Sequence, residues 1–289
     1  MHLASLADLP PAAFQAVIIN VNTRAVATLA LLSALRYAGM PVLLIDCEST
    51  DGSWAHFSAL MSQHRFEMLS APLKAHGDTL NWLFQHIPAR RVLLIDSDLE
   101  LLDAELVRQM CAAAQAERAM GSGSIQCGVW MTAQRQPFAW YEERPWVPLT
   151  LLDVAAMREA LASGLSFRAR VELNEFPPSP LISRLLIKRF RLPLVRRLRL
   201  SWLDVFRRDF GGKKPAYVMY DTAAEIYQHL LGRGYTFADL SAAFDPLPVR
   251  HYHGVTRLLL NARDRNGASL AQIAPEIDAR LRDEYGVVC

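Results

Sequence analysis

Cysteine is scarce in this sequence. Among 289 residues there are four cysteines, and no two of them form a CxxC pair. Such irregular spacing excludes a disulfide framework and offers no zinc-ligand pattern. We therefore expect reduced thiols and a cytoplasmic protein. The four positions are Cys47, Cys111, Cys127 and Cys289.

Long hydrophobic runs are also missing. No stretch approaches the ~18 consecutive apolar residues that predict a membrane-spanning helix. The opening residues, MHLASLADLPPAAF, lack the basic start and apolar core of a secretory signal. The formal net charge is only +2, so total charge predicts no partner. We expect a soluble protein, with attachment to the cytoplasmic face of the inner membrane as the open alternative.

What the first hundred residues do contain is an alternation of two patterns. Short apolar runs, typical of buried strands, alternate with segments of helical periodicity. This order predicts a mostly parallel, Rossmann-like α/β sheet flanked by helices. The expected strands are 16–21, 41–46 and 92–96, and the expected helices are 24–38, 54–62, 78–87 and 103–117.

Polar residues follow each predicted strand at its carboxyl end. In a parallel sheet these ends share one edge, where ligands bind, so we expect one crevice there. Paired aspartates in such a crevice repel unless a cation lies between them. Carboxylate oxygens suit Mg²⁺ or Mn²⁺. The residues concerned are Asn22, Thr23 and Arg24, then Asp46 with Ser49, Thr50 and Asp51, and finally Asp96, Ser97 and Asp98.

These three segments resemble the nucleotide-binding half of GT-A glycosyltransferases, especially the inverting family 2. The resemblance is carried by AVIINVNTRAVATLALLSAL, VLLIDCESTDGS and VLLIDSDLELL, and it is clear over residues 16–110. It implies a nucleotide-sugar-binding half, 1–120, and an acceptor-binding half, 121–289, within one continuous domain. Asp46 would recognise the nucleobase of the donor, and the DxD aspartates would bind the metal and the sugar diphosphate. We expect Asp98 on the metal itself, and Asp96 on the ribose or a metal-bound water.

The resemblance extends loosely into the second half. Family members place an acidic base at the start of a helix, and YDTAAEIYQHLLGRGYTF fits with Asp221 as the base. The usual Glu-Asp pair is here Tyr220-Asp221, and a simple helix N-cap is the alternative role. Glu225, Glu172 and Glu175 are backup candidates for the base.

A histidine often completes the metal site in this family, in a His-x-x-Gly context. The segment VRHYHGVTR offers His251 and His253, which share one face if the segment is a strand. We expect His251 to be the ligand and His253 to be the second choice.

The resemblance implies direct displacement with inversion. Asp221 would take a proton from an acceptor hydroxyl, which attacks the anomeric carbon of a UDP- or GDP-linked sugar. A role in bacterial surface polysaccharide or lipopolysaccharide assembly is an expectation by analogy only.

Two segments lack clear periodicity. GSGSIQCG (121–128) predicts a flexible link, and FAWYEERPWVPL (138–149) predicts an irregular or binding segment. Aromatic residues in and near the second segment could stack on the acceptor, although ordinary packing is the commoner role. They are Trp130, Trp140, Tyr141 and Trp146.

Residues 184–214 concentrate positive charge, with eleven Lys and Arg against two Asp. The bases alternate with apolar residues, which favours attachment to an anionic membrane surface. Solvated helix faces are the plain alternative, an acidic partner protein is another, and no nucleic-acid motif accompanies the charge.

Two other functions stay open. The first is a degenerate glycosyltransferase-like protein that binds a ligand without turnover. The second is a phosphatase or phosphotransferase with an Asp nucleophile, but its motif follows the first strand and places Thr or Val where this chain has Glu100.

Overall fold

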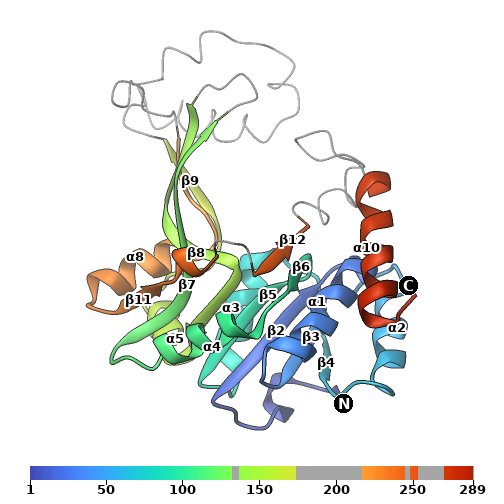
Figure 1. Cartoon of the computed structure of the whole chain (residues 1–289). Helices are drawn as coiled ribbons and strands as arrows, with labels where there is room; N and C mark the ends of the chain where they lie inside the picture. The colour runs from blue at the N-terminus through green and yellow to red at the C-terminus, as the bar shows by residue number, and fades with distance from the viewer. Residues whose placement is uncertain (132–136, 174–216, 245–247, 253–269, 289) are drawn as a thin grey trace.

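The chain folds around one large mixed sheet (Figure 1). The structure is a computed structural model that describes residues 1–131, 137–173, 217–244, 248–252 and 270–288. The strand order is β1-β4-β3-β2-β5-β8-β10-β9, with β7 paired to β8 and β11 paired to β7. The strands of this sheet are β1 (His2–Leu3), β2 (Phe14–Asn20), β3 (Val42–Asp46), β4 (Glu67–Ser70), β5 (Arg91–Asp96), β7 (Ala119–Met131), β8 (Pro137–Asp153), β9 (Arg170–Leu173), β10 (Tyr217–Tyr220) and β11 (Thr236–Asp239).

The predicted alternation of the first hundred residues is confirmed. Strands β2, β3 and β5 lie side by side and parallel, and they are joined by helices close to their predicted bounds. An additional strand, β4, pairs parallel with β3. The helices are α1 (Arg24–Tyr37), α2 (Ser53–Leu60), α3 (His76–His86) and α4 (Ala104–Ala113).

Both faces of this sheet are covered. Along β2, Val17 belongs to one core cluster and Ile18 to the other, because successive strand residues point to opposite faces. Side chains of α1, α2 and α4 pack on one face, and those of α3, α5 (Val154–Ala162) and α8 (Ala224–Gly232) pack on the other. Burial on both faces explains why the predicted strands are continuous apolar runs.

The prediction of a flexible link at 121–128 is wrong, because these residues belong to β7. Gly121 lies so close to β8 that an added Cβ would be 2.2 Å from the Leu151 carbonyl oxygen. The buried Ser122 hydroxyl donates to the Met110 carbonyl at 2.7 Å. Small residues here therefore serve close packing between strands.

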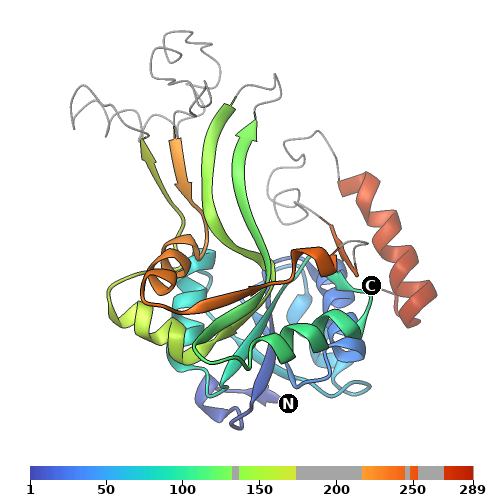
Figure 2. The ribbon, with the colours of Figure 1, turned by 60° about the vertical axis from the view of Figure 1, so that its left-hand side comes forward.

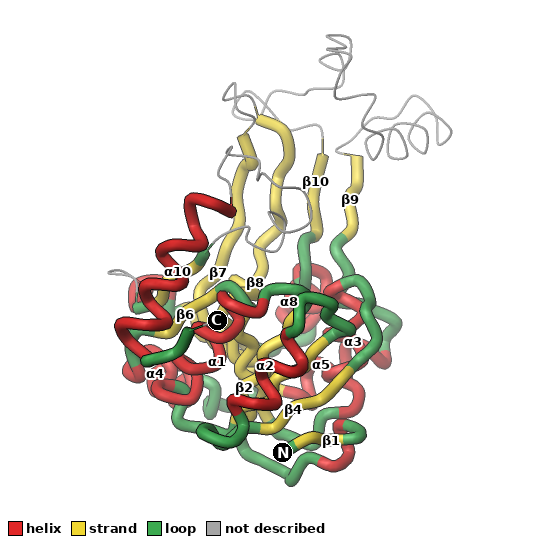
Figure 3. Tube along the Cα trace, turned by 90° about the vertical axis from the view of Figure 1, so that its right-hand side faces the viewer, coloured by secondary structure: helices red, strands yellow, loops and turns green. Residues whose placement is uncertain are grey.

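The prediction of an irregular segment at 138–149 is also wrong. It lies in β8, which pairs antiparallel with β5 and β7 and parallel with β10. Register shifts in the β7–β8 ladder, one of them between Gly123 and Ile125, accommodate sequence that breaks simple alternation. Figures 2 and 3 show the far ends of β7, β8, β9 and β10 extending away from the helix-covered sheet.

The last described elements cover the carboxyl side of β5. Strand β6 (Leu99–Leu101) pairs antiparallel with β12 (Val249–His251), and α10 (Leu270–Tyr285) packs against α1. The short helices are η1 (Leu6–Asp8) and η3 (Ser241–Phe244). In the described part of the chain, no helix combines the length and apolar character that a membrane crossing requires.

Candidate metal and nucleotide-sugar site

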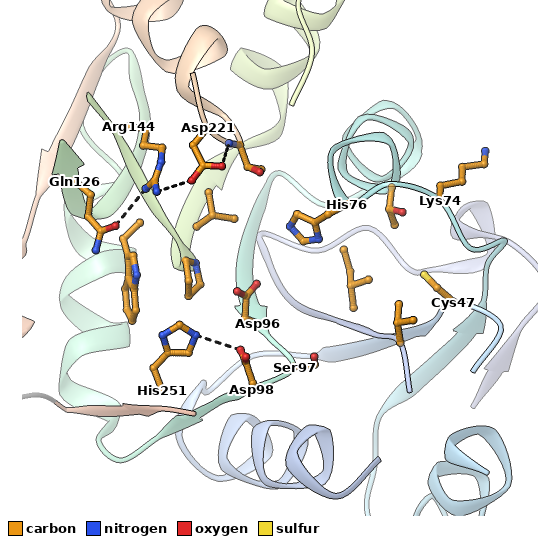
Figure 4. A pocket seen from close by; sticks show the side chains of 17 residues that line it. Cys47, Lys74, His76, Asp96, Ser97, Asp98, Gln126, Arg144, Asp221 and His251 are labelled. Atoms are coloured by element: carbon orange, nitrogen blue, oxygen red, sulfur yellow. Dashed lines mark hydrogen bonds and ion pairs between the residues drawn. The ribbon is translucent and has the colours of Figure 1, made fainter. Parts of the chain in front are cut away.

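A cavity of about 440 Å³ opens at the carboxyl ends of β2 and β5. The DxD residues Asp96, Ser97 and Asp98 line it, together with His251 and Asp221 (Figure 4). Five residues proposed from separate stretches of sequence therefore meet in one space. The other described lining residues are Ile19, Val21, Cys47, Lys74, His76, Thr79, Gln126, Arg144, Trp146, Val147, Pro148 and Thr222.

Two carboxylates and one imidazole converge in the cavity. One ligand atom each from Asp96, Asp98 and His251 lie within 4.8 Å of one another. The His251 Nε2 is 3.2 Å from an Asp98 carboxylate oxygen. Asp98 is buried, and Asp96 and His251 are half-buried, so the group is partly shielded from solvent.

The backbone brings these residues together across the chain. Asp96 ends β5, and the chain then turns into β6, which carries β12 beside it. The Tyr252 amide donates to the Asp98 carbonyl at 2.8 Å and extends this ladder past His251. The β6–β12 pair therefore places His251 beside Asp98, although the two residues are far apart in the sequence.

The electrostatics of the group favour a cation. Burial raises the pKa of the Asp96 carboxyl; the positive fields of His76 and His251 oppose the rise, and the charge of Asp98 adds to it. A divalent ion between the carboxylates would remove this conflict. Two carboxylate oxygens and an imidazole nitrogen fit Mn²⁺, and they leave positions for phosphate oxygens or water.

The polar strand ends form a hydrogen-bonded network beside the cavity. The buried Asn20 donates to Asp46 at 2.6 Å and accepts from the Thr23 hydroxyl at 2.6 Å. Thr23 Oγ1 also lies 3.1 Å from Ser97 Oγ. The chain of contacts runs from the end of β3 to the serine between the two metal-site aspartates, so it holds that turn in place.

The loop after β3 is tied to the start of α1 in the same way. The Asn22 amide donates to Ser49 Oγ at 2.9 Å, and the Asn22 side chain accepts from the Thr50 amide at 2.6 Å. The Arg24 amide donates to the Asp51 carboxylate at 3.0 Å. Burial raises the Asp51 pKa, but bonds from Ser53 and Arg24 outweigh it, so the net shift is downward.

These contacts divide the predicted nucleotide-sugar residues into two sets. Asp96 and Ser97 line the cavity. The remaining six are not among the described residues that line it. Asp46 is only 2% exposed, and its carboxylate accepts hydrogen bonds from the Asn20 side chain and the Ser49 amide. The six are Asn22, Thr23, Arg24, Asp46, Ser49 and Asp51.

Asp221 reaches the cavity from the sheet, not from a helix. It directly follows β10, and α8 begins three residues later with Ala223 as its N-cap. The prediction that Asp221 starts the helix is therefore wrong. Its carboxylate accepts from Arg144 Nη2 at 2.7 Å and from the Thr222 amide at 2.9 Å.

Sequence reasoning missed the wall that carries Arg144. Arg144 lies on β8, and its guanidinium also donates weakly to Gln126 of β7 at 3.3 Å. Trp146, two residues on, stands edge-on to His251 with ring centroids 5.5 Å apart. The alternation of Arg144 and Trp146 on one strand was the available signal, but it lay in a segment predicted to be irregular.

A second missed group lies on the opposite side of the cavity. Lys74 and His76 come from the loop after β4 and the first residue of α3 (Figure 4). The sequence does not predict β4, so the polar residues that follow its carboxyl end carry no signal before the fold is known. Both side chains are exposed, and His76 is close enough to Asp96 to lower its pKa.

The backup candidates for the base lie elsewhere or are not described. Glu225 and Glu172 both pair with Arg170, away from the described cavity lining. Glu100, which stands where the phosphatase motif has Thr or Val, pairs with Arg280. Glu175, His253 and the basic segment 184–214 lie outside the described residues, as does the side chain of Trp130.

Comparison with known proteins gives only remote structural likenesses. No protein-family model and no curated protein matches the sequence. The mannosyltransferase PcManGT from Pyrobaculum calidifontis, in complex with GDP-Man and Mn²⁺, is 14% identical with a TM-score of 0.41. The match covers 55% of this chain and 50% of that one.

Two other solved structures are comparable. TarS 1–349 of S. aureus, in complex with UDP-GlcNAc, is 15% identical with a TM-score of 0.35, and the match covers 50% of this chain and 46% of TarS. The 4-diphosphocytidyl-2C-methyl-D-erythritol synthase of Anaerococcus prevotii is 10% identical with a TM-score of 0.38, over 62% of this chain and 82% of that one. The chain thus matches about half the length of PcManGT and TarS. At these TM-scores the likenesses carry no argument, and the case for function rests on the site.

Proposed function

We propose that the chain is a metal-dependent glycosyltransferase that moves a sugar from a nucleotide diphosphate to a hydroxyl acceptor. The observation that carries the proposal is the convergence of Asp96, Asp98 and His251 in a cavity at the carboxyl edge of parallel strands. A divalent ion there and the adjacent cationic side chains suit a sugar diphosphate, whose charge would otherwise be repelled by the carboxylates.

Asp98 and His251 would hold the ion directly, with Asp96 as the third ligand or as the partner of a bound water. Mn²⁺ suits this set better than Mg²⁺, because imidazole is a poor ligand for harder ions. When bound, the ion would neutralise charge on the departing diphosphate.

The donor would lie along the ends of β2 and β3. Ile19, Val21 and Cys47 line this part of the cavity with apolar side chains. Lys74 and His76 would supply positive charge for the phosphates. Asn22, Thr23, Arg24, Asp46, Ser49 and Asp51 would act mainly by keeping the loops around the nucleotide in shape. Asp46, with its carboxylate already engaged, would support the nucleotide site from beneath.

Asp221 would serve as the general base. Its carboxylate would take the proton of an acceptor hydroxyl while that oxygen forms a bond to the anomeric carbon. The bond from that carbon to the diphosphate oxygen would break, and the configuration would invert. Arg144 would orient the carboxylate, and Trp146 would offer an apolar face to the acceptor.

The basic segment 184–214 would bring the enzyme to an anionic membrane surface. A lipid-linked acceptor at the cytoplasmic face of a bacterial inner membrane, within surface polysaccharide or lipopolysaccharide assembly, fits such a location. Binding to anionic liposomes should weaken with salt and be lost when Arg196, Arg197 and Arg199 are neutralised. Unchanged binding would remove this part of the proposal.

The direct test is a thermal-shift screen of nucleoside diphosphates and their sugars, with and without Mn²⁺. We expect UDP or GDP, and the matching sugars, to stabilise the protein only when Mn²⁺ is present, because ligand binding to the folded state raises its stability. No response to any nucleotide at millimolar concentration would contradict the proposal.

A second candidate is binding without turnover. The ion pair between Asp221 and Arg144 favours it, since the arginine already occupies one of the two carboxylate oxygens. Metal-dependent nucleotide binding with no release of sugar to water or to any offered acceptor would support this candidate.

A further inference from the structure

A buried carboxylate lies just behind the metal group. Glu100, two residues after Asp98 and on β6, has no exposed surface. Such a charge is costly to bury unless it is paired and hydrogen-bonded. Its position beside the metal motif raises the question of what the charge does there.

The partners of Glu100 come mainly from α10, at the far end of the chain. Arg280 Nη2 donates to one carboxylate oxygen at 2.6 Å, and its Nε lies 3.3 Å from the other. The hydroxyls of Tyr285 and Tyr252 each donate at 3.3 Å. Four donors therefore surround one carboxylate, and the three from α10 join this helix to β6.

Tyr252 connects this cluster to the metal group. Its amide donates to the Asp98 carbonyl, and its ring packs with Leu29 of α1 and Ile277 of α10. The residue before it is His251. Because successive residues of a strand point to opposite sides, the strand that presents His251 to the cavity presents Tyr252 to α10.

We propose that Glu100 and Arg280 are positioning residues of the metal centre. Their ion pair joins α10 to β6, and the Tyr252 hydroxyl bonds to the same carboxylate, so the cluster holds the end of β12 in place and keeps the His251 imidazole at Asp98. A second link supports it, since Arg250 of β12 lies 3.5 Å from Glu276 of α10. This inference rests on the metal centre of the proposed function and is independent of the sugar transferred.

The test uses Mn²⁺ alone and the full chain. Arg280→Met removes the charge and keeps the stem length. Arg282→Met is the matched control, since Arg282 lies on the same helix, is exposed, and pairs only with the neighbouring Asp283 among described residues. We expect Arg280→Met to weaken Mn²⁺ binding about 10- to 100-fold, the range for lost support behind a metal ligand, and Arg282→Met to leave it unchanged.

A spectroscopic readout separates positioning from general stability. Bound Mn²⁺ should show nitrogen coupling from His251 in electron spin-echo spectra, and Arg280→Met should diminish it, as His251→Ala does. Glu100→Gln, which keeps shape, replaces Arg280→Met if that variant does not fold. A lower melting temperature with unchanged Mn²⁺ affinity and nitrogen coupling would overturn this inference alone. Failure of the unaltered chain to bind Mn²⁺ would overturn the metal centre as well.

Discussion

The two walls of the cavity are built in different ways. One wall comes from the ends of β2, β3 and β5, three neighbouring parallel strands within the first hundred residues. Its polar side chains mostly bond to each other. The other wall draws Arg144, Asp221 and His251 from distant parts of the chain, and its side chains point into the cavity. The first wall supplies Asp96 and Asp98 to the candidate metal group and is otherwise bonded within itself. The second wall adds His251 to that group and places Asp221 in the cavity.

The largest effect is expected at Asp98, whose carboxylate on the first wall lies beside His251 on the second. Asp98→Asn should abolish Mn²⁺ binding and transfer together, because a neutral amide cannot replace the carboxylate opposite His251. Asp278→Asn, an exposed aspartate of α10, is the control. Mn²⁺ titration and product assays measure both effects, and full activity in Asp98→Asn would contradict the metal assignment.

Within the second wall, a change at Asp221 should affect chemistry but not metal binding. Asp221→Asn should lower transfer by about 10²- to 10⁴-fold, the usual contribution of a general base, with Mn²⁺ and nucleotide binding retained. Glu225→Gln, which alters an acid of α8 that pairs with Arg170, should remain active. Near-normal turnover in Asp221→Asn would refute the assignment of Asp221 as the general base.

Arg144 tests whether the second wall also recognises the acceptor. Arg144→Met breaks the contacts with Asp221 and Gln126. A lost hydrogen bond to a charged group costs about 1.5–3 kcal/mol, so kcat/KM for the acceptor should fall about ten- to a hundredfold. The KM for the donor should stay within about twofold, and an equal rise in both KM values would contradict separate walls.

A change in the first wall should lower stability more than chemistry. Thr23→Val removes the buried hydroxyl that bonds to Asn20 and lies near Ser97. The free energy of unfolding should fall by about 1–3 kcal/mol, the cost of an unsatisfied buried group. Thr50→Val, at an exposed position, is the matched control, and chemical denaturation measures both. Equal stability of the two variants would contradict the network.

Asp96 offers the smallest and most specific effect, on pH dependence. Its folded pKa is raised chiefly by burial, so in metal-free protein the ionised carboxylate destabilises the fold at neutral pH. That destabilisation disappears as the pH falls through the raised pKa. Asp96→Asn should therefore be more stable than the unaltered chain at neutral pH, and the gap should close on acidification. A difference in stability between Asp96→Asn and the unaltered chain that grows toward low pH would contradict a raised Asp96 pKa.

The first wall was largely predictable from sequence, because the hydrophobic periodicity of a segment and the residues at the end of a strand are local properties. Asp96, Ser97 and Asp98 lie in the cavity as their place after a buried strand required. His251 was also identified, through its spacing and its neighbour Gly254. The aspartates needed only the rule that parallel strands end at one edge, whereas His251 came from the resemblance to GT-A glycosyltransferases.

The position of Arg144 in the second wall was not predictable, because nonlocal strand pairing decides it. Gly121 and Ser122 have a composition typical of loops, yet they pack tightly against β8. Arg144 gains its role only when β8 is laid beside β10, which brings Asp221 next to it. Likewise, Glu100 appears as an ordinary strand residue until α10 supplies Arg280.

The most direct test of the metal centre is a Mn²⁺ titration followed by electron paramagnetic resonance. The unaltered chain should bind one Mn²⁺, and His251→Ala should bind it at least about tenfold more weakly, because it lacks one ligand. His86→Ala, at an exposed histidine of α3, should bind as the unaltered chain does. Identical binding by all three proteins, or none by any, would contradict a metal centre formed by Asp96, Asp98 and His251.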